Sequence, residues 1–407
     1  MVDPADAHPA NTDLGIYVHV PYCRRKCSYC DFYSLARAPD PAFASAIAAE
    51  LAQCDRSPAP VTALQPGRQL ASIYFGGGTP SVLDATAIDA IISALQRRFD
   101  LRADAEITVE VNPATVDRNA LLALRAAGVN RLSIGVQSLD DRWLTVLGRL
   151  HDARQASATV EAARAAGFAN ISVDLILAIP GQTLSDSERD VRAIVALATP
   201  HLSAYLLTIE PGTPLHAQRQ AGQWTASGDD LAADMLEHAL DQFAAAGLCR
   251  YEISNFAHPG AAARHNRRYW SGGEVLGLGP GAHSHFQLPG GGGLRYANPD
   301  DIDGYLAFFA AGAAPGVRFA RSEDVLDPAG YLLERLYLGL RDLERGADLD
   351  AASATSGLCV WPALEHCLAD LGERGLLQRE GPKLRLTADG ARLADLVAAQ
   401  VLAAVPH

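Results

Sequence analysis

Three cysteines near the start of the chain have the type and spacing to hold a metal cluster. Cys23, Cys27 and Cys30 are separated by three and two residues in the run GIYVHVPYCRRKCSYCDF. Thiolates this close together suit a [4Fe–4S] cluster, in which three protein ligands leave one iron open to a small molecule. A structural zinc site would need a further short pair of cysteines or histidines, and none follows. We therefore predict an iron–sulfur cluster with one exchangeable iron.

The remaining cysteines do not indicate disulfides. The total of seven is odd, and the N-terminus lacks the cationic and apolar regions of a secretion signal. The four cysteines outside the triad are scattered along the chain at Cys54, Cys249, Cys359 and Cys367. Reduced thiols and an oxygen-sensitive cluster both predict a cytoplasmic protein.

The composition is that of a soluble globular protein. The chain has 407 residues, of which 49% are hydrophobic and 20% are charged. No uninterrupted apolar run approaches the ~20 residues that a membrane helix needs. The formal net charge of −13 argues against nucleic acid as a partner, because phosphate binding needs a basic face. Residues 1–13 are polar and contain proline, so we expect a disordered tail.

From residue 14 to about 250, short β-branched runs alternate with alanine-rich helical stretches. The expected strands are 15–20, 72–75, 106–111, 131–136, 171–177 and 201–207. Several helical stretches end in glycine, which favours helix C-caps, at Gly128, Gly167 and Gly247. This alternation implies parallel strands with right-handed crossovers. Six such units favour an α/β fold built as a partial (β/α)6 barrel over a doubly wound sheet.

The rest of the chain has a different composition. Residues 251–320 are rich in glycine and aromatics, and we expect an irregular layer or short hairpins packed on the barrel. Residues 321–407 show amphipathic helices followed by LRLTADG, a strand and a turn. This order predicts a small winged-helix-like C-terminal domain.

Polar residues follow or end several of the expected strands. Barrel enzymes place their working groups there. The glycines of Gly76–Gly78 could turn their N–H groups outward as an anion nest. Glu110, Gln137 and Asp174 stand in apolar strands, where each could also simply cap a helix. Their recurrence favours a ligand with hydroxyl and amino groups. Arg149 suits a ligand carboxylate, although a surface salt bridge is its alternative.

These motifs together resemble a known family. The cysteine triad, GGGTP, VEVNP, IGVQS, LGRLHD and DLILAIPGQT are similar, in order, to motifs of the oxygen-independent coproporphyrinogen III oxidase family of radical S-adenosylmethionine (SAM) proteins. The resemblance covers nearly the whole chain and implies a radical SAM barrel whose cluster binds SAM at the fourth iron. It also implies a set of SAM-site residues, namely Tyr17, Tyr29, Gly77, Gly78, Thr79, Glu110, Gln137, Arg149 and Asp174.

Two departures separate this chain from the oxidases of that family. Oxidases carry a further cysteine two positions after the third, where this chain has Phe32, and they have a long N-terminal extension. Both departures favour a subgroup of heme chaperones, as does the run HNRRYW. In that run His265 could ligate heme iron, although such a histidine is often only structural. Tyr269 and Trp270 could lie on the porphyrin, and its propionates could meet three arginines, Arg264, Arg267 and Arg268.

The resemblance therefore implies two functions, beside the third alternative of a radical SAM enzyme that acts on another substrate. A heme chaperone would hold heme beside the cluster and SAM and pass it to acceptor hemoproteins, such as membrane respiratory enzymes reached by transient docking. An oxidase would use a SAM-derived radical to decarboxylate coproporphyrinogen III. The three cysteines serve both functions equally, so they do not decide whether the chain is an enzyme. Phe32 and His265 favour the chaperone. The oligomeric state, monomer or homodimer, is not decided by the sequence.

Overall fold

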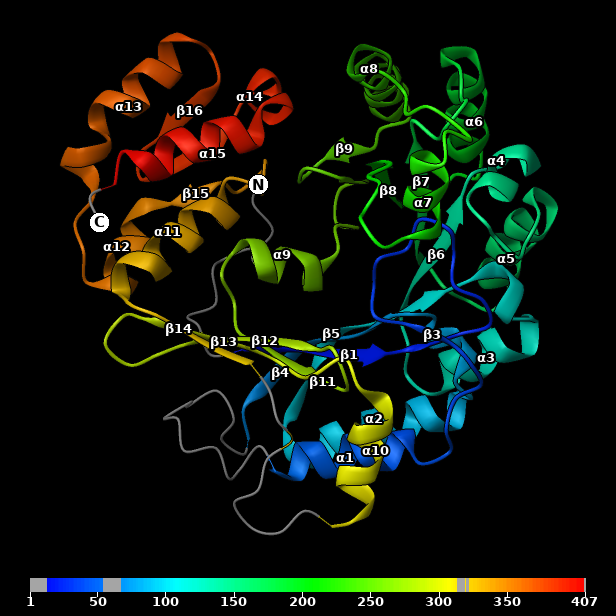
Figure 1. The fold of residues 1–407 in the computed structure, drawn as a ribbon. Coiled ribbons are helices and arrows are strands. Elements are labelled where there is room, and N and C mark those ends of the chain that lie inside the picture. The colour runs from blue at the N-terminus through cyan, green and yellow to red at the C-terminus, as the bar shows by residue number, and fades with distance from the viewer. Residues whose placement is uncertain (1–12, 54–66, 313–318, 320–321, 406–407) are drawn as a thin grey trace.

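The computed structural model describes residues 13–53, 67–312, 319 and 322–405. Its centre is a twelve-stranded sheet in the order β14-β13-β12-β11-β1-β4-β5-β6-β7-β8-β10-β9. Six consecutive strands in that order are parallel and correspond to the six predicted ones. They are β1 (Leu14–Val20), β4 (Gln69–Gly77), β5 (Asp100–Val111), β6 (Arg131–Gln137), β7 (Asn170–Leu177) and β8 (His201–Leu206). The sheet curves into an open ring, so the predicted partial barrel is confirmed (Figure 1).

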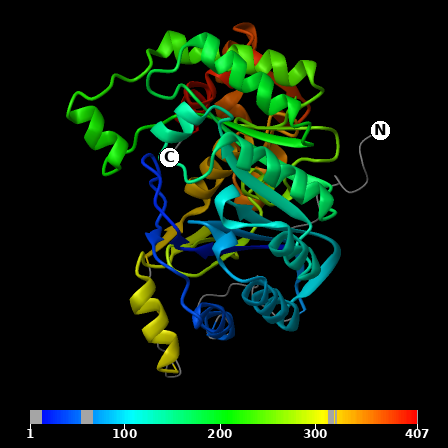
Figure 2. The same cartoon turned by 90° about the vertical axis from the view of Figure 1, so that its right-hand side faces the viewer.

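Helices connect the parallel strands and cover the outer side of the ring. This side faces the viewer in Figure 2. They are α1 (Phe43–Gln53), α2 (Ala85–Arg98), α3 (Arg118–Ala126), α4 (Asp141–Val146), α5 (Ala153–Ala165), α6 (Leu184–Ala196) and α8 (Asp229–Ala245). A shorter helix, α7 (Pro214–Gln220), precedes α8. Helix ends follow local signals: Asp152 forms a capping box with Gln155 at the start of α5. The predicted C-cap glycines Gly128, Gly167 and Gly247 all have positive φ.

Side chains alternate in direction along each strand, so the sheet has an outward and an inward face. Outward residues such as Ile73, Phe75 and Val109 are fully buried in one core with the helices. Inward residues are mostly polar or aromatic, and neighbouring strands bring them together: the rings of Tyr17 and Tyr74 stack at 6.2 Å. We call the space enclosed by the inward side chains the lumen. Period-two alternation in parallel strands thus gives the barrel an apolar outside and a polar inside.

The region after residue 250 differs from the expected irregular segment. It contributes strands to the same sheet. The other expected form, a short hairpin, is seen in β12 and β13, which pair antiparallel. Its elements are β9 (Cys249–Arg250), β10 (Asn255–Ala257), α9 (Arg264–Trp270), β11 (Val275–Leu278), β12 (His283–Gln287), β13 (Gly293–Ala297) and α10 (Ile302–Ala310). Strand β11 pairs parallel with β1, and β14 (Ser322–Leu326) closes this edge. These strands were not predicted, because glycine-rich segments are typical of loops. In the structure the glycines allow close packing of the backbone.

Residues from α11 onward form a separate small domain with its own core. It contains α11 (Pro328–Gly339), α12 (Leu349–Ser356), α13 (Trp361–Glu373), α14 (Ala388–Arg392) and α15 (Ala394–Ala403). Three short strands form its antiparallel sheet, β15 (Ala347–Asp348), β16 (Leu377–Glu380) and β17 (Lys383–Leu386). The expected boundary at residue 321 moves past β14, which belongs to the large sheet.

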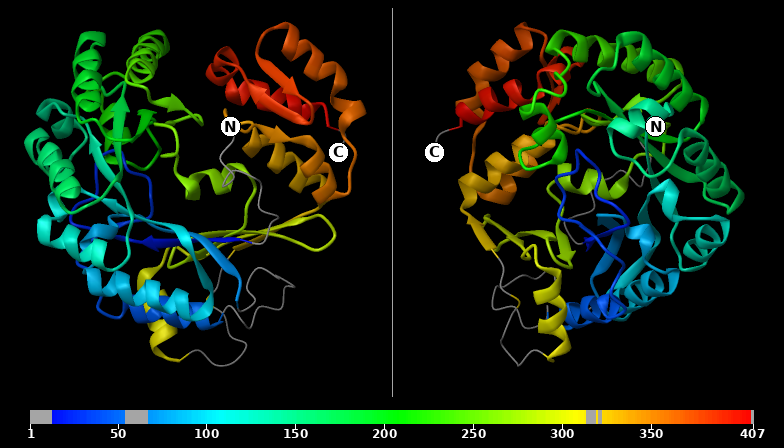
Figure 3. Two further views of the ribbon diagram at one scale, coloured as in Figure 1. Left: turned by 180° about the vertical axis from the view of Figure 1, so that it is seen from behind. Right: turned by 45° about the vertical axis from the view of Figure 1, so that its right-hand side comes forward.

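The small domain lies across the open side of the ring (Figure 3). On one side Arg267 of α9 forms an ion pair with Glu344. On the other, Arg392 Nη2 lies 2.5 Å from Glu237 Oε2 on α8. The two contacts join the small domain to both flanks of the barrel.

The predicted N-terminal tail can be compared with the structure only at its end. Residues 1–12 lie outside the described part of the chain. Asp13 is buried, and its Oδ2 accepts a 2.7 Å hydrogen bond from Arg102. Asp13, which the prediction included in the tail, is therefore part of the fold. Among the described helices, none is both long and apolar enough to cross a membrane.

Glycine at position 277 is required where β11 meets β12. A Cβ atom there would lie 2.7 Å from the carbonyl carbon of His283, a backbone atom that cannot rotate away. We expect Gly277→Ala to lower the free energy of unfolding by about 2–4 kcal/mol, measured by denaturant titration. Gly372→Ala is the matched control, because its Cβ would meet nothing closer than 3.9 Å on exposed helix α13. The control should be neutral or slightly stabilising, and equal losses would contradict the packing argument.

Candidate functional site

The cysteine loop leaves the end of β1 and is held from two sides. Thr79 Oγ1, in the loop after β4, donates to Cys23 Sγ over 3.3 Å. Arg149 Nη1, in the turn after α4, donates to Cys27 Sγ over 3.3 Å. The short strands β2 (Tyr22–Cys23) and β3 (Leu35–Ala36) pair and close the base of the loop. The triad therefore stands at the carboxyl end of the barrel, as predicted.

The donor set of three cysteine side chains fits a [4Fe–4S] cluster by its chemistry. Cys23, Cys27 and Cys30 are all free thiols. Within the described residues, no three side chains of histidine, cysteine, aspartate or glutamate converge as ligands of one metal ion would. A cubane takes each ligand on a different iron, so its sulfurs are spread apart. Burial raises the pKa of Cys23 and of Cys30, so cluster binding must displace their protons.

The glycines at the end of β4 pack against neighbouring segments, and the expected anion nest is not formed by the N–H groups of residues 78 and 79. Gly78 N and Thr79 N donate to Val20 O and Tyr22 O, both over 2.8 Å. A Cβ at Gly77 would lie 2.7 Å from the ring of His19, and Gly77 has φ +108°. The backbone N–H groups at 78 and 79 are therefore not available to a ligand. The glycines instead let this loop lie directly against β1 and the cysteine loop.

Two carboxyl groups face the lumen from β5 and β7. Tyr74 Oη donates to Glu110 Oε1 over 2.8 Å. Burial raises the pKa of Glu110 to about 7 and that of Asp174 to about 6, although hydrogen bonds from Tyr74 to Glu110 and from Ser203 to Asp174 oppose the rise. Both acids are poised to change charge near neutral pH. The predicted pair is thus on one surface of the barrel, with acceptors for hydroxyl or amino groups.

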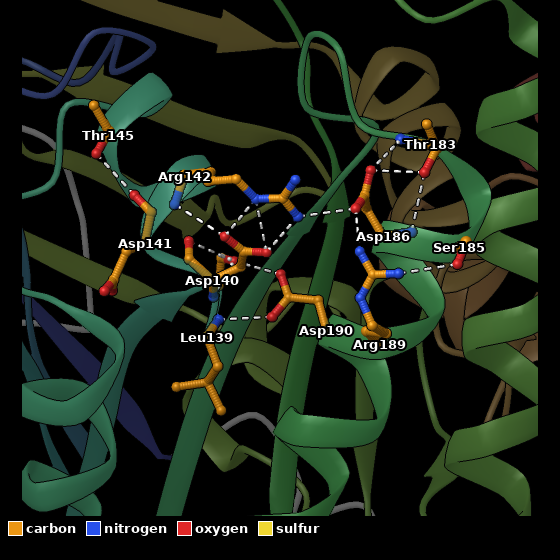
Figure 4. Close-up of polar contacts among 11 residues, drawn as sticks. Leu139, Asp140, Asp141, Arg142, Thr145, Thr183, Ser185, Asp186, Arg189 and Asp190 are labelled. Atoms are coloured by element: carbon orange, nitrogen blue, oxygen red, sulfur yellow. Dashed lines mark hydrogen bonds and ion pairs between the residues drawn. The ribbon is translucent and has the colours of Figure 1, made fainter.

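Gln137 ends β6 in an unusual backbone conformation. Its φ of 69° is in the left-handed region, and the β6–β7 register shifts between Ile134 and Gln137. Just beyond it, Asp190 of α6 accepts from Ser138 Oγ and, over 2.6 Å, from Leu139 N. Figure 4 shows this brace and, above it, the guanidinium of Arg142 between two carboxylates. The brace fixes the turn that presents Gln137 to the lumen.

Arg149 lies between the cysteine loop and the lumen. Besides Cys27 Sγ, its guanidinium contacts Gly135 O, 2.7 Å from Nη2. Its buried Nε makes no hydrogen bond among the described residues. A Cβ at Gly135 would approach both Gln137 Nε2 and Arg149 Nη2, so these two side chains share one space. The guanidinium of Arg149 therefore lies beside Cys27, and the alternative, a surface salt bridge, is not formed with any described residue. Tyr29 lies nearby, packed against the small cluster around Trp143.

Helix α9, which carries HNRRYW, lies inside the ring (Figure 1). Glu106 on β5 caps it, accepting from Arg264 N and His265 N at 3.0 Å each. His265 is 1% exposed, its Nδ1 lies 2.9 Å from Ser72 Oγ, and its Nε2 makes no hydrogen bond among the described residues. Its ring stacks on Tyr74 at 5.1 Å. Burial lowers the pKa of His265 to about 3, which keeps the imidazole neutral as a metal ligand must be.

Two of the α9 arginines, Arg267 and Arg268, turn into the fold and not toward a propionate, whereas the side chain of Arg264 is exposed. Arg264 Nη1 donates to Asp104 O over 2.7 Å. Arg267 pairs with Glu344 and lies over the ring of Tyr251 at 4.8 Å. Arg268 Nη1 donates to Asp13 O over 2.8 Å. All three arginines hold α9 in place within the fold.

A surface groove approaches the cysteine loop from the opposite direction. Its volume is about 930 Å³, and it is lined by Cys23 and Arg24 and by residues of α2 and α3. Glu110 and Asp174 are not part of its lining. The groove therefore reaches the triad from outside the barrel and is distinct from the lumen.

Comparison with known proteins agrees with this geometry. Residues 17–194 match the Radical SAM superfamily, and residues 326–393 match the HemN C-terminal domain. "Heme chaperone HemW" of Mycobacterium tuberculosis (strain H37Rv) is 34% identical over 397 residues, which cover 96% of this chain and 95% of the relative. This chain belongs to the HemW family. The HemW of Escherichia coli is 38% identical, over 72% of this chain and 75% of the relative.

This chain is also similar to proteins of animals. The mouse protein "Radical S-adenosyl methionine domain-containing protein 1, mitochondrial" is 37% identical, over 83% of this chain and 75% of the relative. Among solved structures, coproporphyrinogen III oxidase (HemN) from Escherichia coli superimposes with a TM-score of 0.78, over 96% of this chain and 90% of that chain. At 23% identity this likeness shows a shared fold. A HemW-family chain and an oxidase thus use one architecture.

Several lumen residues were missed by sequence reasoning. Ser72, Glu106 and Arg131 all face inward, and Glu106 and Ser72 hold α9 and His265. Arg131, at the start of β6, is 2% exposed. The available signal was a polar residue at every second position of an apolar strand, as in RLSIGVQ. The prediction considered polar residues at strand ends, whereas these three lie in the middle or at the start of their strands.

Glu110 should lower the stability of the free protein at neutral pH. Its folded pKa, about 7, is above the unfolded value of about 4.3, so the folded state binds more protons between these values. The loss of stability caused by ionised Glu110 is complete above pH 7 and becomes smaller as the pH falls from 7 toward about 4.3. We expect Glu110→Gln to raise the free energy of unfolding by about 1–3 kcal/mol at pH 8 and by little at pH 4.5.

Glu237→Gln is the matched control, because its partner Arg392 lowers the pKa of that exposed carboxyl. Its removal should give no gain at pH 8. A Glu110→Gln effect of the same size at both pH values would contradict a charge penalty.

The cysteine triad should be required as a unit. We expect Cys23→Ser, Cys27→Ser or Cys30→Ser each to abolish the cluster's visible absorbance and its iron and sulfide content after anaerobic reconstitution, since a cubane held by two thiolates is poorly retained. Cys249→Ser is the control, because Cys249 is exposed on β9 outside the triad. Full cluster content in a triad variant would show that another residue supplies a ligand.

Proposed function

We propose that this protein is a heme chaperone that binds heme and transfers it to acceptor hemoproteins. It would carry a [4Fe–4S] cluster on Cys23, Cys27 and Cys30, with SAM at the fourth iron. The proposal places it in the cytoplasm, with membrane respiratory enzymes as acceptors reached by transient docking. Membership of the HemW family, in which relatives bear the name heme chaperone, supports this function.

The observation that carries the proposal is the position of His265. It lies in the lumen against Tyr17 and Tyr74, whose rings stack on its imidazole at 6.5 Å and 5.1 Å. Tyr17 is also in the SAM-site set, and Tyr74 donates to Glu110 of that set. A heme ligand at His265 would therefore share its supporting side chains with SAM. Because His265 is closed to solvent here, heme coordination requires α9 to move outward from Glu106 and Ser72.

SAM would be held by the chain's inward groups. Glu110, Gln137 and Asp174 offer oxygen acceptors for its hydroxyl and amino groups, and Arg149 offers a guanidinium for its carboxylate. When bound, the cluster supplies electrons and the site for SAM chelation. Phe32, where oxidases have a fourth cysteine, is 68% exposed, so this position lies on the surface of the loop.

Heme binding without oxidase turnover tests the proposal. We expect the full-length, cluster-loaded protein to bind heme in a spectroscopic titration and to leave coproporphyrinogen III unconverted in the presence of SAM and reductant. His265→Ala should weaken heme affinity about tenfold or more while leaving the cluster absorbance intact, because one axial ligand is lost.

His366→Ala is the control, since His366 is exposed on α13 of the small domain. Turnover of coproporphyrinogen III would favour the oxidase alternative. Unchanged heme affinity in His265→Ala would place the ligand elsewhere.

A further inference from the structure

The cysteine loop is joined to the turn after α4 by hydrogen bonds to four consecutive carbonyl groups. Helix α4 ends at Val146, and the turn runs on through Leu147 and Gly148 to Arg149. A helix leaves its last carbonyl groups without partners inside the helix, so they must find donors elsewhere. The carbonyl groups of these four residues all accept hydrogen bonds from the cysteine loop.

Ser28, between the second and third cysteines, supplies two of these hydrogen bonds. Its Oγ donates to Val146 O over 2.9 Å, and its backbone N–H donates to Leu147 O over 3.2 Å. Its own carbonyl accepts from Leu215 N on α7 over 2.8 Å. A Cβ at Gly148, where φ is +71°, would lie 3.2 Å from Ser28 N, so glycine lets the turn lie directly against the loop. The hydroxyl, the N–H and the carbonyl of Ser28 are therefore all engaged with neighbouring helix ends.

Arg25, between the first and second cysteines, supplies the other two hydrogen bonds. Its Nη2 donates to Gly148 O over 2.7 Å and to Arg149 O over 2.6 Å. Because the guanidinium is charged, these bonds are stronger than those of a neutral donor. In the opposite direction, Arg149 Nη1 donates to Cys27 Sγ over 3.3 Å. The loop thus holds the backbone of the turn, and the turn holds one cysteine of the loop.

These contacts reduce the cost of ordering the loop. A loop that is free before its ligand binds loses conformational entropy on binding, whereas a loop already fixed loses less. Arg25 is exposed and Ser28 is half-buried, so neither side chain is needed to fill the apolar core. Their hydrogen bonds instead connect two segments 122 residues apart, one carrying Cys27 and the other carrying Arg149.

We propose that Ser28 and Arg25 are positioning residues, which fix the cysteine loop on the turn after α4 and so place Cys27 and Arg149 beside each other before the cluster and SAM bind. Neither residue ligates iron or contacts SAM in this proposal, and both act through Cys27 and Arg149. The consequence for the cluster and SAM rests on the proposed function. The fixing of the loop by the turn does not depend on it.

Hydrogen–deuterium exchange of the full-length, cluster-free chain tests the fixing of the loop. We expect Ser28→Ala and Arg25→Gln each to raise the amide exchange rate in peptides covering residues 26–30 and 147–150 by about fivefold or more, because hydrogen bonds between the two segments are lost. If Ser28→Ala does not fold, Arg25→Gln tests the same turn, since its side chain is exposed.

Each variant has a matched control. Lys26→Gln removes another exposed positive charge from the same loop, as Arg25→Gln does. Ser45→Ala removes a hydroxyl that donates to Ala42 O over 2.7 Å at the start of α1, away from the loop. Both controls should exchange like wild type. Unchanged exchange in Arg25→Gln and Ser28→Ala, or equal increases in the controls, would overturn the proposal.

Retention of the cluster supplies the second measurement. After anaerobic reconstitution, we expect Ser28→Ala to lose the cluster's visible absorbance to EDTA about threefold to tenfold faster than wild type. Ser28→Thr keeps the hydroxyl and should restore the wild-type rate. Equal losses in the alanine and threonine variants would show that the hydroxyl is not the cause and would overturn the proposal. If wild type takes up no cluster, the proposed function fails, while the exchange rates still decide the role of Ser28 and Arg25.

Discussion

The two-residue alternation of parallel strands is the constraint on which this structure depends. Each strand turns one set of side chains toward the helices and the other toward the lumen. The first set, such as Ile73 and Val109, forms the apolar core. The second set must be polar where a ligand is to be held, and the curved sheet brings it together from six strands. The same alternation therefore produces the stability of the barrel and the chemistry of its interior.

A polar interior has an energetic cost that the protein distributes over a network. Glu110 and Asp174 are desolvated and resist ionisation, and hydroxyl groups and arginines offset part of that penalty. Glu106 is satisfied differently, by the backbone N–H groups at the start of α9. The helix in the ring is thus held by a buried carboxylate on one side. Through Arg267 and Glu344 it is held by the small domain on the other.

This arrangement links the two motifs that distinguish the chain. The cysteine loop is positioned by the loops after β4 and α4, whereas HNRRYW is positioned from inside the ring. The rings of Tyr17 and Tyr74 stack on each other and on His265, and Tyr74 also donates to Glu110. A movement of α9 would change the packing around these rings. Coupling between heme and SAM, if both bind, would pass through them and not through the shared fold, which a HemW-family chain has in common with HemN.

The sequence by itself determined the local features of this protein. Strand and helix order, the cysteine triad, the capping signals and the inward acids Glu110 and Asp174 all follow from patterns within a few residues. Tertiary structure decided what depends on contacts between distant segments. It showed that Gly77 and Gly78 serve packing, that the glycine-rich region adds strands to the sheet, and that Arg131 is buried inside the barrel. The physical reason is that a side chain's burial, charge balance and partners are set by neighbouring strands, and strand neighbours are far apart in sequence.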